Sequence, residues 1–198
     1  MSDKFLTITT RAEASLTEKR SRFLAFALPI ETATQARSII KEFSKEYYDA
    51  RHVCWAYMLG AERSEFLSSD NGEPSGTAGK PILGQINSLG LTNLIVLVVR
   101  YFGGIKLGTP GLIAAYKESA RLVLESSEIV ERHETARISF TFPYLSMNDV
   151  MKAVKDPEVT VIERQFDNAC AMTVEIRSDL APSLRDAIAD IPGVSLGD

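Results

Sequence analysis

Two glycine-rich segments hold most of the residues whose types and spacing could bind or transform a ligand. The first, residues 70–81, reads DNGEPSGTAGKP and mixes glycines with small hydroxyl and acidic residues. A loop of this composition can turn several backbone N–H groups to one side, and such a nest binds anions, phosphates above all. We expect an anion contact through residues of this loop, the candidates being Asp70, Glu73, Ser75, Gly76 and Thr77.

This loop differs from a nucleotide-binding P-loop. Pro74 stands where that motif has its first glycine, and Pro81 follows Lys80 in place of Ser or Thr. The alternative explanation is an ordered surface loop whose glycines only supply positive φ. Asp70 and Glu73 also form a candidate acid pair, although such carboxylates more often cap turns.

The second segment, residues 100–111, reads RYFGGIKLGTPG and follows the most apolar run of the chain. That run, LIVLVV, predicts a strand over 93–101 that is covered on both faces. A helix follows, with Thr109 expected as N-cap and Pro110 at the first helical position. A helix N-terminus after a strand is a natural anion site. The candidate residues here are Arg100, Tyr101, Gly103, Gly104, Lys106 and Thr109.

In this second segment Arg100 and Lys106 would supply positive charge, and Tyr101 or Phe102 a stacking face. Tight packing is the alternative explanation for its glycines, and we expect Phe102 in the core. Three further cations, Lys19, Arg20 and Arg22, lie beside a predicted strand over 21–29. They would either contact a polyanion or form a solvated edge that blocks strand pairing.

His52 and Cys54 are two residues apart, so on a strand they share a face. A catalytic pair is one explanation, but it lacks a visible third member, and a packed strand explains the spacing better. We expect no metal site, because only His133 and a distant Cys170 remain as soft ligands. No cofactor is expected either.

The remaining periodicity predicts two α+β domains, over 1–133 and 134–198. In the first we expect strands over 4–10, 21–29 and 52–59 and one beginning near 66, with helices over 32–48, 81–89 and 110–126. Thr32 or Thr34 would cap the first of these helices. In the second we expect strands over 137–142, 159–166, 170–176 and 194–196 and helices over 146–155 and 180–191, with a turn at Asp167–Asn168 and Ser146 as a cap. The order βαββαβ is the ferredoxin-like pattern.

Composition and charge limit the function classes. Apolar residues make up 45% of the 198 residues, which excludes a disordered chain. The net charge of -4 is uneven, since residues 1–133 carry 16 basic and 15 acidic side chains and residues 134–198 carry 6 and 11. A polyanion would therefore meet the first domain at a local patch. The two cysteines are far apart in the sequence and do not suggest a disulfide framework, and the N-terminus has no apolar run of signal-peptide length. No apolar run is long enough to span a membrane. We therefore expect a cytoplasmic location and no membrane partner.

Four motifs, in order, resemble the IMPACT family: KRSRF, the H-x-C-x-A-Y of His52 to Tyr57, DNGEPSGTAGKPIL and VVRYFGGIKLG. The resemblance covers roughly residues 15 to 130, and the region 134–198 is similar in pattern to the smaller C-terminal domain of bacterial members. The resemblance implies that the first domain has the fold shared by a domain of a small-subunit ribosomal protein and domain IV of elongation factor G. It implies that the second domain resembles the ferredoxin-like domains of the same elongation factor. Pro110 departs from the family, many members having glycine there.

The leading hypothesis is a non-enzymatic module that binds RNA or the ribosome and is linked to the regulation of translation. The first alternative is an enzyme acting on a small phosphorylated or carboxylated ligand held by the glycine-rich loops, with Asp70, Glu73 or His52 transferring protons. The second is a protein–protein regulator that uses the acidic second domain. An open face carrying Arg22, Arg100 and Lys106 would favour RNA, and a closed cleft joining them to Asp70 would favour the enzyme.

Overall fold

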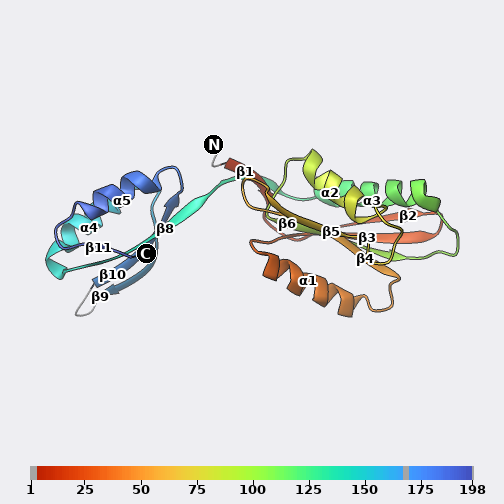
Figure 1. The fold of residues 1–198 in the computed structure, drawn as a ribbon, viewed down its shortest axis with the longest axis horizontal. Coiled ribbons are helices and arrows are strands. Elements are labelled where there is room, and N and C mark those ends of the chain that lie inside the picture. The colour runs from red at the N-terminus through yellow and green to blue at the C-terminus, as the bar shows by residue number, and fades with distance from the viewer. Residues whose placement is uncertain (1–3, 167–169, 198) are drawn as a thin grey trace. The chain divides into compact units, whose positions relative to one another are not determined.

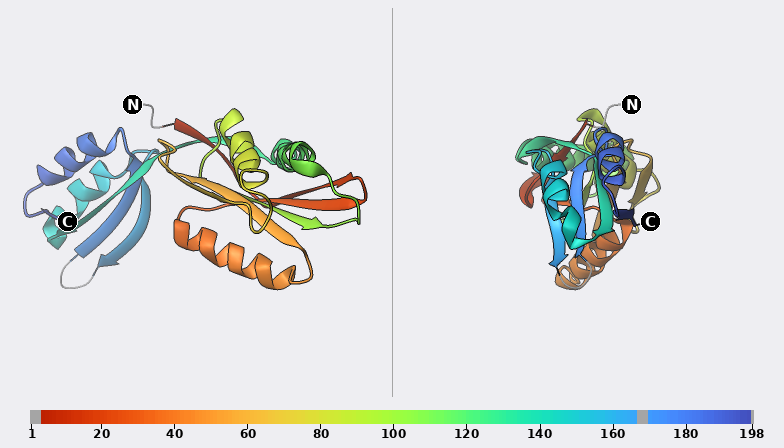
Figure 2. Two further views of the ribbon diagram at one scale, coloured as in Figure 1. Left: turned by 45° about the vertical axis from the view of Figure 1, so that its right-hand side comes forward. Right: turned by 90° about the vertical axis from the view of Figure 1, so that its left-hand side faces the viewer.

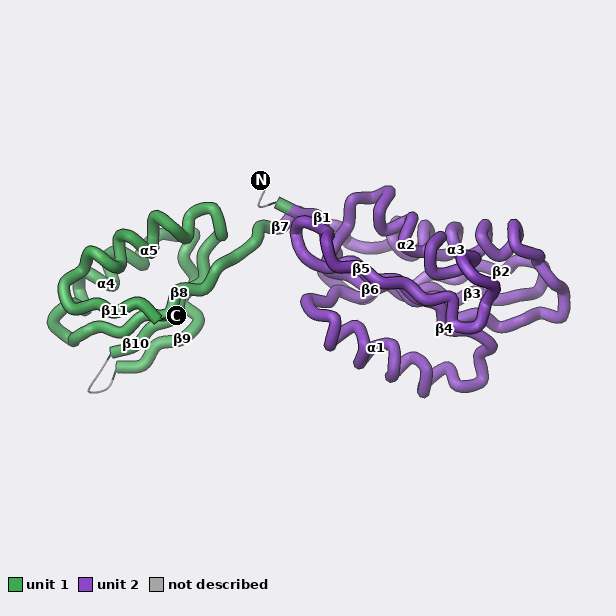
Figure 3. The backbone as a smooth tube through the Cα atoms, viewed as in Figure 1, with its two compact units in different colours: residues 1–4, 133–198 green, residues 5–132 purple. Residues whose placement is uncertain are grey.

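The structure, a computed structural model, describes residues 4–166 and 170–197. It is an α+β protein whose chain divides into two compact units, residues 5–132 and residues 1–4 with 133–198 (Figure 3). We call them the first and the second unit in chain order, the first being residues 5–132. No helix in the described part of the chain is both long and apolar enough to cross a membrane.

The first unit is built on a five-stranded antiparallel sheet in the order β2-β3-β6-β4-β5. Its strands are β2 (Ala12–Glu18), β3 (Ser21–Pro29), β4 (His52–Leu59), β5 (Glu65–Ser69) and β6 (Leu94–Tyr101). One face carries α1 (Ala33–Glu46), and the other carries α2 (Gly79–Ser88) and α3 (Gly108–Glu125) (Figures 1 and 2).

The central strand β6 is buried on both faces, as its continuous apolar run predicted. Leu94, Val96 and Val98 enter the core under α2 and α3. The residues between them, among them Ile95 and Leu97, enter the core under α1. Because successive side chains of a strand point to opposite faces, β6 contributes to two hydrophobic layers. This packing on both sides fixes the C-terminal end of β6, where the candidate residues begin.

The helix starts were predicted correctly in one place and wrongly in another. Of the two predicted caps of α1, Thr32 and Thr34, the structure has Thr32, which forms a capping box with Gln35. The prediction of Thr109 as the cap of α3 is wrong, because the helix begins at Gly108 after Leu107 and has no side-chain cap. Gly108 has a φ of 73°, which glycine adopts without strain, so the chain turns into the helix before Thr109. Pro110 still lies in the first turn, where its missing N–H costs no hydrogen bond.

Two strands of the first unit were not predicted. β2 pairs with β3 along its whole length, and β7 (Ile129–His133) forms a two-stranded sheet with β1 (Lys4–Ile8). In β2 the alternating Ala12, Ala14 and Leu16 pack against the core under α2 and α3. Two of these three residues are alanines. The alternation of a strand was therefore present in the sequence, but alanine is only a weak indicator of a β-strand.

The second unit is a four-stranded antiparallel sheet in the order β11-β8-β10-β9. Its elements are β8 (Thr135–Phe142), α4 (Met147–Ala153), β9 (Thr160–Phe166), β10 (Cys170–Arg177), α5 (Ala181–Ala189) and β11 (Ser195–Leu196), with a 3-10 turn at Tyr144–Ser146. The predicted order βαββαβ is therefore present. The predicted turn at Asp167–Asn168 lies outside the described residues.

Ser146 precedes α4, as predicted, but does not cap it with its side chain. Its hydroxyl donates to the carbonyl oxygen of Pro192 at 2.7 Å. The prediction of Ser146 as a capping side chain is therefore wrong, because a partner brought near by the tertiary fold takes the hydroxyl instead.

Candidate functional site

A row of three side chains crosses the end of the first unit's sheet. In the strand register, Arg100 on β6 pairs with Phe23 on β3 and with His52 on β4. Directly paired residues of antiparallel strands project from the same face, so all three lie on the face that carries α2 and α3. The guanidinium carbon of Arg100 lies 5.6 Å from the centre of the Phe23 ring.

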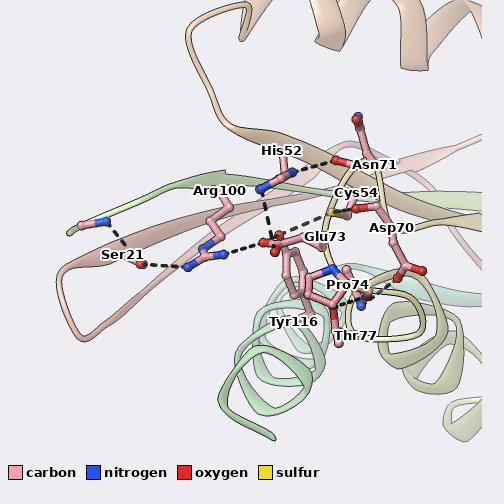
Figure 4. A network of polar contacts seen from close by, with 12 residues as sticks. Ser21, His52, Cys54, Asp70, Asn71, Glu73, Pro74, Thr77, Arg100 and Tyr116 are labelled. Atoms are coloured by element: carbon pink, nitrogen blue, oxygen red, sulfur yellow. Dashed lines mark hydrogen bonds and ion pairs between the residues drawn. The ribbon is translucent and has the colours of Figure 1, made fainter. Parts of the chain in front are cut away.

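Glu73 reaches this row from the loop between β5 and α2 (Figure 4). Its Oε1 accepts from Nη1 of Arg100 at 2.6 Å and from the hydroxyl of Tyr116 at 2.8 Å. Only 3% of the Glu73 side chain and 7% of the Arg100 side chain are exposed. The pair is therefore a buried ion pair, which pins the loop onto the sheet and onto α3.

Asp70 has a different role from Glu73, although both belong to the same loop. Its carboxylate accepts the backbone N–H groups of Gly76, Ala78 and Gly79 at 2.8 to 2.9 Å. Partial burial raises the pKa of Asp70, but these three hydrogen bonds outweigh it and hold the pKa below its usual value. The nest of N–H groups predicted for a ligand is thus paired with a carboxylate of the chain itself.

The two hydroxyl side chains of the loop do not join the row. Thr77 is buried and donates to the carbonyl oxygen of Pro74 at 2.6 Å. Ser75 is exposed. The loop therefore places only Glu73 among the residues of the row, and Asp70 and Glu73 are not an acid pair facing one ligand.

His52 is held in one orientation by the same loop. Its Nδ1 lies 2.7 Å from the carbonyl oxygen of Asn71, which can only accept, so the neutral ring carries its proton on Nδ1. Nε2 then faces Oε2 of Glu73 at 3.8 Å. His52 and Cys54 share a face as predicted, but the Cys54 thiol is fully buried against the Asp70 carbonyl and the Tyr116 hydroxyl. Burial raises the pKa of Cys54 to about 12, so the thiol stays protonated and is a poor nucleophile.

The hairpin turn between β2 and β3 lies directly against the segment after β6. Lys19 and Arg20 form the turn with φ values of 43° and 67°. Gly103 packs so close to Arg20 that a side chain there would overlap the Arg20 backbone. The Ser21 hydroxyl joins the two segments, because it accepts the Gly103 N–H at 3.3 Å and lies 3.5 Å from Nη2 of Arg100.

Arg22 and Arg100 lie on opposite faces of the sheet. Arg22 pairs with Tyr101 in the register, and the Tyr101 hydroxyl donates to Asp49 on the side of α1. Arg100 faces α2 and α3. Consecutive residues of a strand project to opposite sides, so Arg22 and Arg100 cannot contact one small ligand together.

The side facing α3 contains a pocket of about 440 Å³ at this end of the sheet. Its lining comes from the start of β4, the loop before α2, the end of β6 and the start of α3: Arg51, His52, Gly72, Glu73, Pro74, Arg100, Phe102, Lys106, Leu107, Gly108, Thr109 and Leu112. The predicted candidates Glu73, Arg100, Lys106 and Thr109 are thus brought together. Asp70, Ser75, Gly76, Thr77, Tyr101, Gly103 and Gly104 are not among the lining residues, and neither are Lys19, Arg20 and Arg22.

Five cations at this end of the sheet are exposed, and we call them the basic end: Lys19, Arg20, Arg22, Arg51 and Lys106. The turn after β2, the starts of β3 and β4 and the segment after β6 supply them. Arg51 was not predicted as a site residue, because a single arginine before a strand belongs to no sequence motif for anion binding. Phe102, expected in the core, is 48% exposed and lines the pocket, so that expectation is wrong. The strand ends at Tyr101, and the following glycines carry the chain away from the core.

The described residues contain no group of three or more His, Cys, Asp or Glu side chains that could hold a metal ion. The charged residues of the pocket are mainly cations, which would repel one. The arrangement therefore suits an anion, and the phosphate groups of nucleic acids and nucleotides are anions of this kind.

Comparison with known proteins identifies the family. The model of the Impact N-terminal domain matches residues 19–124, more than half of the chain. The chain is 36% identical over 132 residues to IMPACT family member YvyE of Bacillus subtilis, covering 67% of this chain and 61% of that protein. It is 42% identical over 100 residues to YigZ of Escherichia coli, covering 50% of this chain and 49% of that protein.

A third relative, an IMPACT family member of Haemophilus influenzae, is 33% identical over 150 residues, covering 75% of this chain and 73% of that protein. A crystal structure described as a hypothetical protein superposes on 99% of this chain and 97% of its own with a TM-score of 0.77 at 25% identity. The sequence matches thus span about half to three quarters of these relatives' own lengths. On the domain match and these identities, the chain belongs to the IMPACT family and is similar to its bacterial members of the YigZ type.

Proposed function

We propose that this protein is a non-enzymatic RNA-binding module linked to the regulation of translation, and that the basic end is its contact surface for RNA, free or within the ribosome. The observation that carries the proposal is the gathering of five exposed cations from separate segments at one end of one sheet. The whole chain is acidic, with a net charge of -4. A local concentration of cations in an acidic chain supports a contact with a polyanion.

The cations of the basic end lie on both sides of the sheet edge. Arg22 projects on the side of α1, while Lys106 and Arg51 border the pocket on the side of α3. An extended strand of phosphates can contact such a surface at several points, whereas one small ligand cannot. The distribution of charge therefore favours a polymer.

Phe102 adds a second element of single-strand recognition. Its ring is 48% exposed beside Lys106 and lies 5.6 Å from the guanidinium carbon of Arg100. Unpaired bases stack on exposed aromatic rings regardless of sequence, while neighbouring cations follow the backbone. This favours single-stranded RNA over a duplex, whose bases are already stacked.

The chemistry of the buried polar groups supports a binding function more than catalysis. Burial keeps the thiol of Cys54 protonated, and the Asp70 carboxylate is occupied by three N–H donors. Oε1 of Glu73 accepts from Arg100 and Tyr116. Among the described proton-transfer candidates, Nε2 of His52 and Oε2 of Glu73 have no hydrogen-bonding partner, and these two atoms face each other at 3.8 Å.

The link to translation rests on the folds that the family resemblance implies. We propose that the first unit has the fold shared with elongation factor G domain IV and that the second is ferredoxin-like. The antiparallel strand order β11-β8-β10-β9, with the elements in the order βαββαβ, supports the latter. We also propose that the units are independent domains with a boundary near residue 133, and that the protein acts in the cytoplasm.

The test is co-sedimentation with ribosomes and with free single-stranded RNA across a salt series. We expect binding that weakens with salt, because each phosphate that the protein neutralises releases counterions. Arg22→Ala/Lys106→Ala should reduce the slope of log K against log salt by about 0.7 for each phosphate that the variant no longer neutralises. Arg100 is unsuitable for this test, because its replacement would disrupt the buried pair with Glu73.

A charge-matched control is Arg37→Ala/Lys41→Ala. Both residues are exposed on α1, whose first turn follows the opposite end of β3. This double variant changes the net charge equally and should bind as the wild type does. Absence of binding at low salt, or equal weakening in both double variants, would overturn the proposal.

A protein partner for the second unit has one supporting observation. Every residue of the edge strand β9 is exposed, including Val161, Ile162 and Phe166. Exposed edge strands are open to pairing with another chain. A partner that binds there should be displaced by Phe166→Glu, measured by co-purification, without any change in RNA binding.

A further inference from the structure

The pocket has a surplus of positive charge. Its lining contains three permanent cations, Arg51, Arg100 and Lys106, and one carboxylate, Glu73. The formal sum over these four groups is two positive charges. Glu73 already neutralises Arg100 at 2.6 Å, so the uncompensated charges are those of Arg51 and Lys106, at the mouth where both side chains are exposed.

Arg100 has more hydrogen-bond donors than the chain uses. A guanidinium has five N–H donors. Nη1 donates to Glu73 at 2.6 Å, and Nη2 has only the Ser21 hydroxyl at 3.5 Å. Nε has no partner, and it is the one buried side-chain nitrogen or oxygen in residues 4–166 and 170–197 left unsatisfied. A buried polar group without a partner is unfavourable.

The first turn of α3 forms another wall of the pocket. Gly108 and Thr109 line it, and the helix continues for 18 residues without a side-chain cap at its start. The N–H groups of a first turn have no partner within the helix, and the helix dipole favours an anion beside them. Pro110 lacks an N–H, but the N–H groups of Gly108 and Thr109 remain.

The rest of the lining is apolar. Phe102, Leu107 and Leu112 contribute hydrophobic surface next to these polar groups. A volume of about 440 Å³ lies within the range of pockets that enclose whole small molecules and exceeds what a lone inorganic anion fills. An anionic group joined to a flat aromatic ring matches both halves of this lining, since Phe102 can stack on the ring.

We propose that the pocket binds the phosphomonoester group of a nucleotide, with the phosphate between Lys106, Arg51 and the start of α3 and the base against Phe102. A phosphomonoester carries about -1.5 to -2 charges at neutral pH, which matches the surplus of two positive charges. A carboxylate would compensate only half of it. The nucleotide is either a free mononucleotide or the phosphorylated end of an RNA strand, and the second source rests on the function proposed above.

The test compares two forms of one short single-stranded RNA, with a 5′-phosphate and with a 5′-hydroxyl, by fluorescence anisotropy on the full chain. AMP and adenosine serve as competitors. We expect the phosphorylated RNA to bind about tenfold more tightly, because charge-assisted hydrogen bonds are the strong ones. AMP should compete and adenosine should not.

Lys106→Ala should remove most of the preference for the phosphate and most of the competition by AMP. Arg22→Ala is the matched control, because Arg22 belongs to the basic end but projects from the opposite face of the sheet. It should weaken both RNAs equally and leave their ratio unchanged. Thermal unfolding of both variants confirms that these exposed substitutions leave the fold intact.

The outcomes separate the two proposals. If both RNAs bind alike and AMP does not compete, the pocket proposal is overturned and RNA binding stands. If neither RNA binds but AMP, titrated directly by calorimetry, binds saturably, the pocket proposal stands for the free nucleotide and RNA binding falls. A preference that Lys106→Ala and Arg22→Ala change equally would also overturn the pocket proposal, because only Lys106 lines the pocket.

Discussion

Glu73 and Arg100 are 27 positions apart in the chain, yet their side chains meet at 2.6 Å in a nearly solvent-free site. Glu73 lies in the loop between β5 and α2, and Arg100 lies at the C-terminal end of the central strand β6. The Tyr116 hydroxyl completes the contact from α3. The pair therefore joins the loop, the sheet and the helix at the edge of the pocket, and its integrity sets the shape of the candidate site.

We expect Glu73→Ala and Arg100→Ala each to lower the free energy of unfolding by about 3–5 kcal/mol, because each leaves the other charge buried without a partner. The double variant Glu73→Ala/Arg100→Ala should cost less than the sum of the two single changes, since it leaves no uncompensated charge. Urea denaturation followed by circular dichroism measures all three. Additive costs would show that the two residues do not interact energetically.

Asp70→Ala should destabilise the protein by about 2 kcal/mol or more, because it leaves three loop and helix N–H groups without their charged acceptor. Ser75→Ala, in the same loop, should change stability by less than about 0.5 kcal/mol, because Ser75 is exposed. Denaturant midpoints compare the two. Similar midpoints would mean that the carboxylate does not organise the loop.

Asp70 should also make the protein sensitive to acid. Its pKa lies below the usual value in the folded state, so its contribution to stability is present above the ordinary carboxyl pKa of 3.8. That contribution is lost as the pH falls through the folded-state pKa. Asp70→Asn should therefore flatten this part of the pH dependence of unfolding. An unchanged acid transition in the variant would contradict the prediction.

Stability should fall at high pH because of Cys54. Its pKa rises from 9.0 to about 12 on burial, so between these values the unfolded chain releases the thiol proton and the folded chain keeps it. The expected loss of stability is up to about 1.4 kcal/mol per pH unit in this range. Cys54→Ala should reduce the slope of stability against pH above 9, even if it lowers stability at pH 7. Burial also raises the pKa of Tyr116, so part of the slope should remain.

Gly103→Ala should destabilise the first unit and weaken RNA binding, because a side chain would overlap the Arg20 backbone and displace the basic hairpin turn. Gly84→Ala is the control. Gly84 lies in α2 with nothing within 4 Å of an added side chain, so alanine should stabilise by about 0.5–1 kcal/mol. Thermal unfolding and RNA co-sedimentation of both variants test this. Wild-type binding by a stable Gly103→Ala protein would rule out the hairpin turn as a determinant of the surface.

Local patterns in the sequence were sufficient for the elements with strong periodicity. The apolar run of β6 predicted a strand buried on both faces, and the threonines at 32 and 34 marked the start of α1, which Thr32 caps. β2 was missed because alanine carries little apolar signal, although its period of two was present. The family followed from the motifs as well, since the glycine-rich segments match it regardless of how they fold.

The contacts within the site were decided by the tertiary structure alone. Asp70 and Glu73 are three residues apart and equally acidic, and only the fold assigns one to backbone N–H groups and the other to Arg100. Arg22 and Arg100 appeared equivalent as basic residues, but the strand register places them on opposite faces. The physical reason is that a sequence pattern reports spacing along one segment, whereas a buried partner or a shared pocket depends on which distant segments the packing of the core brings together.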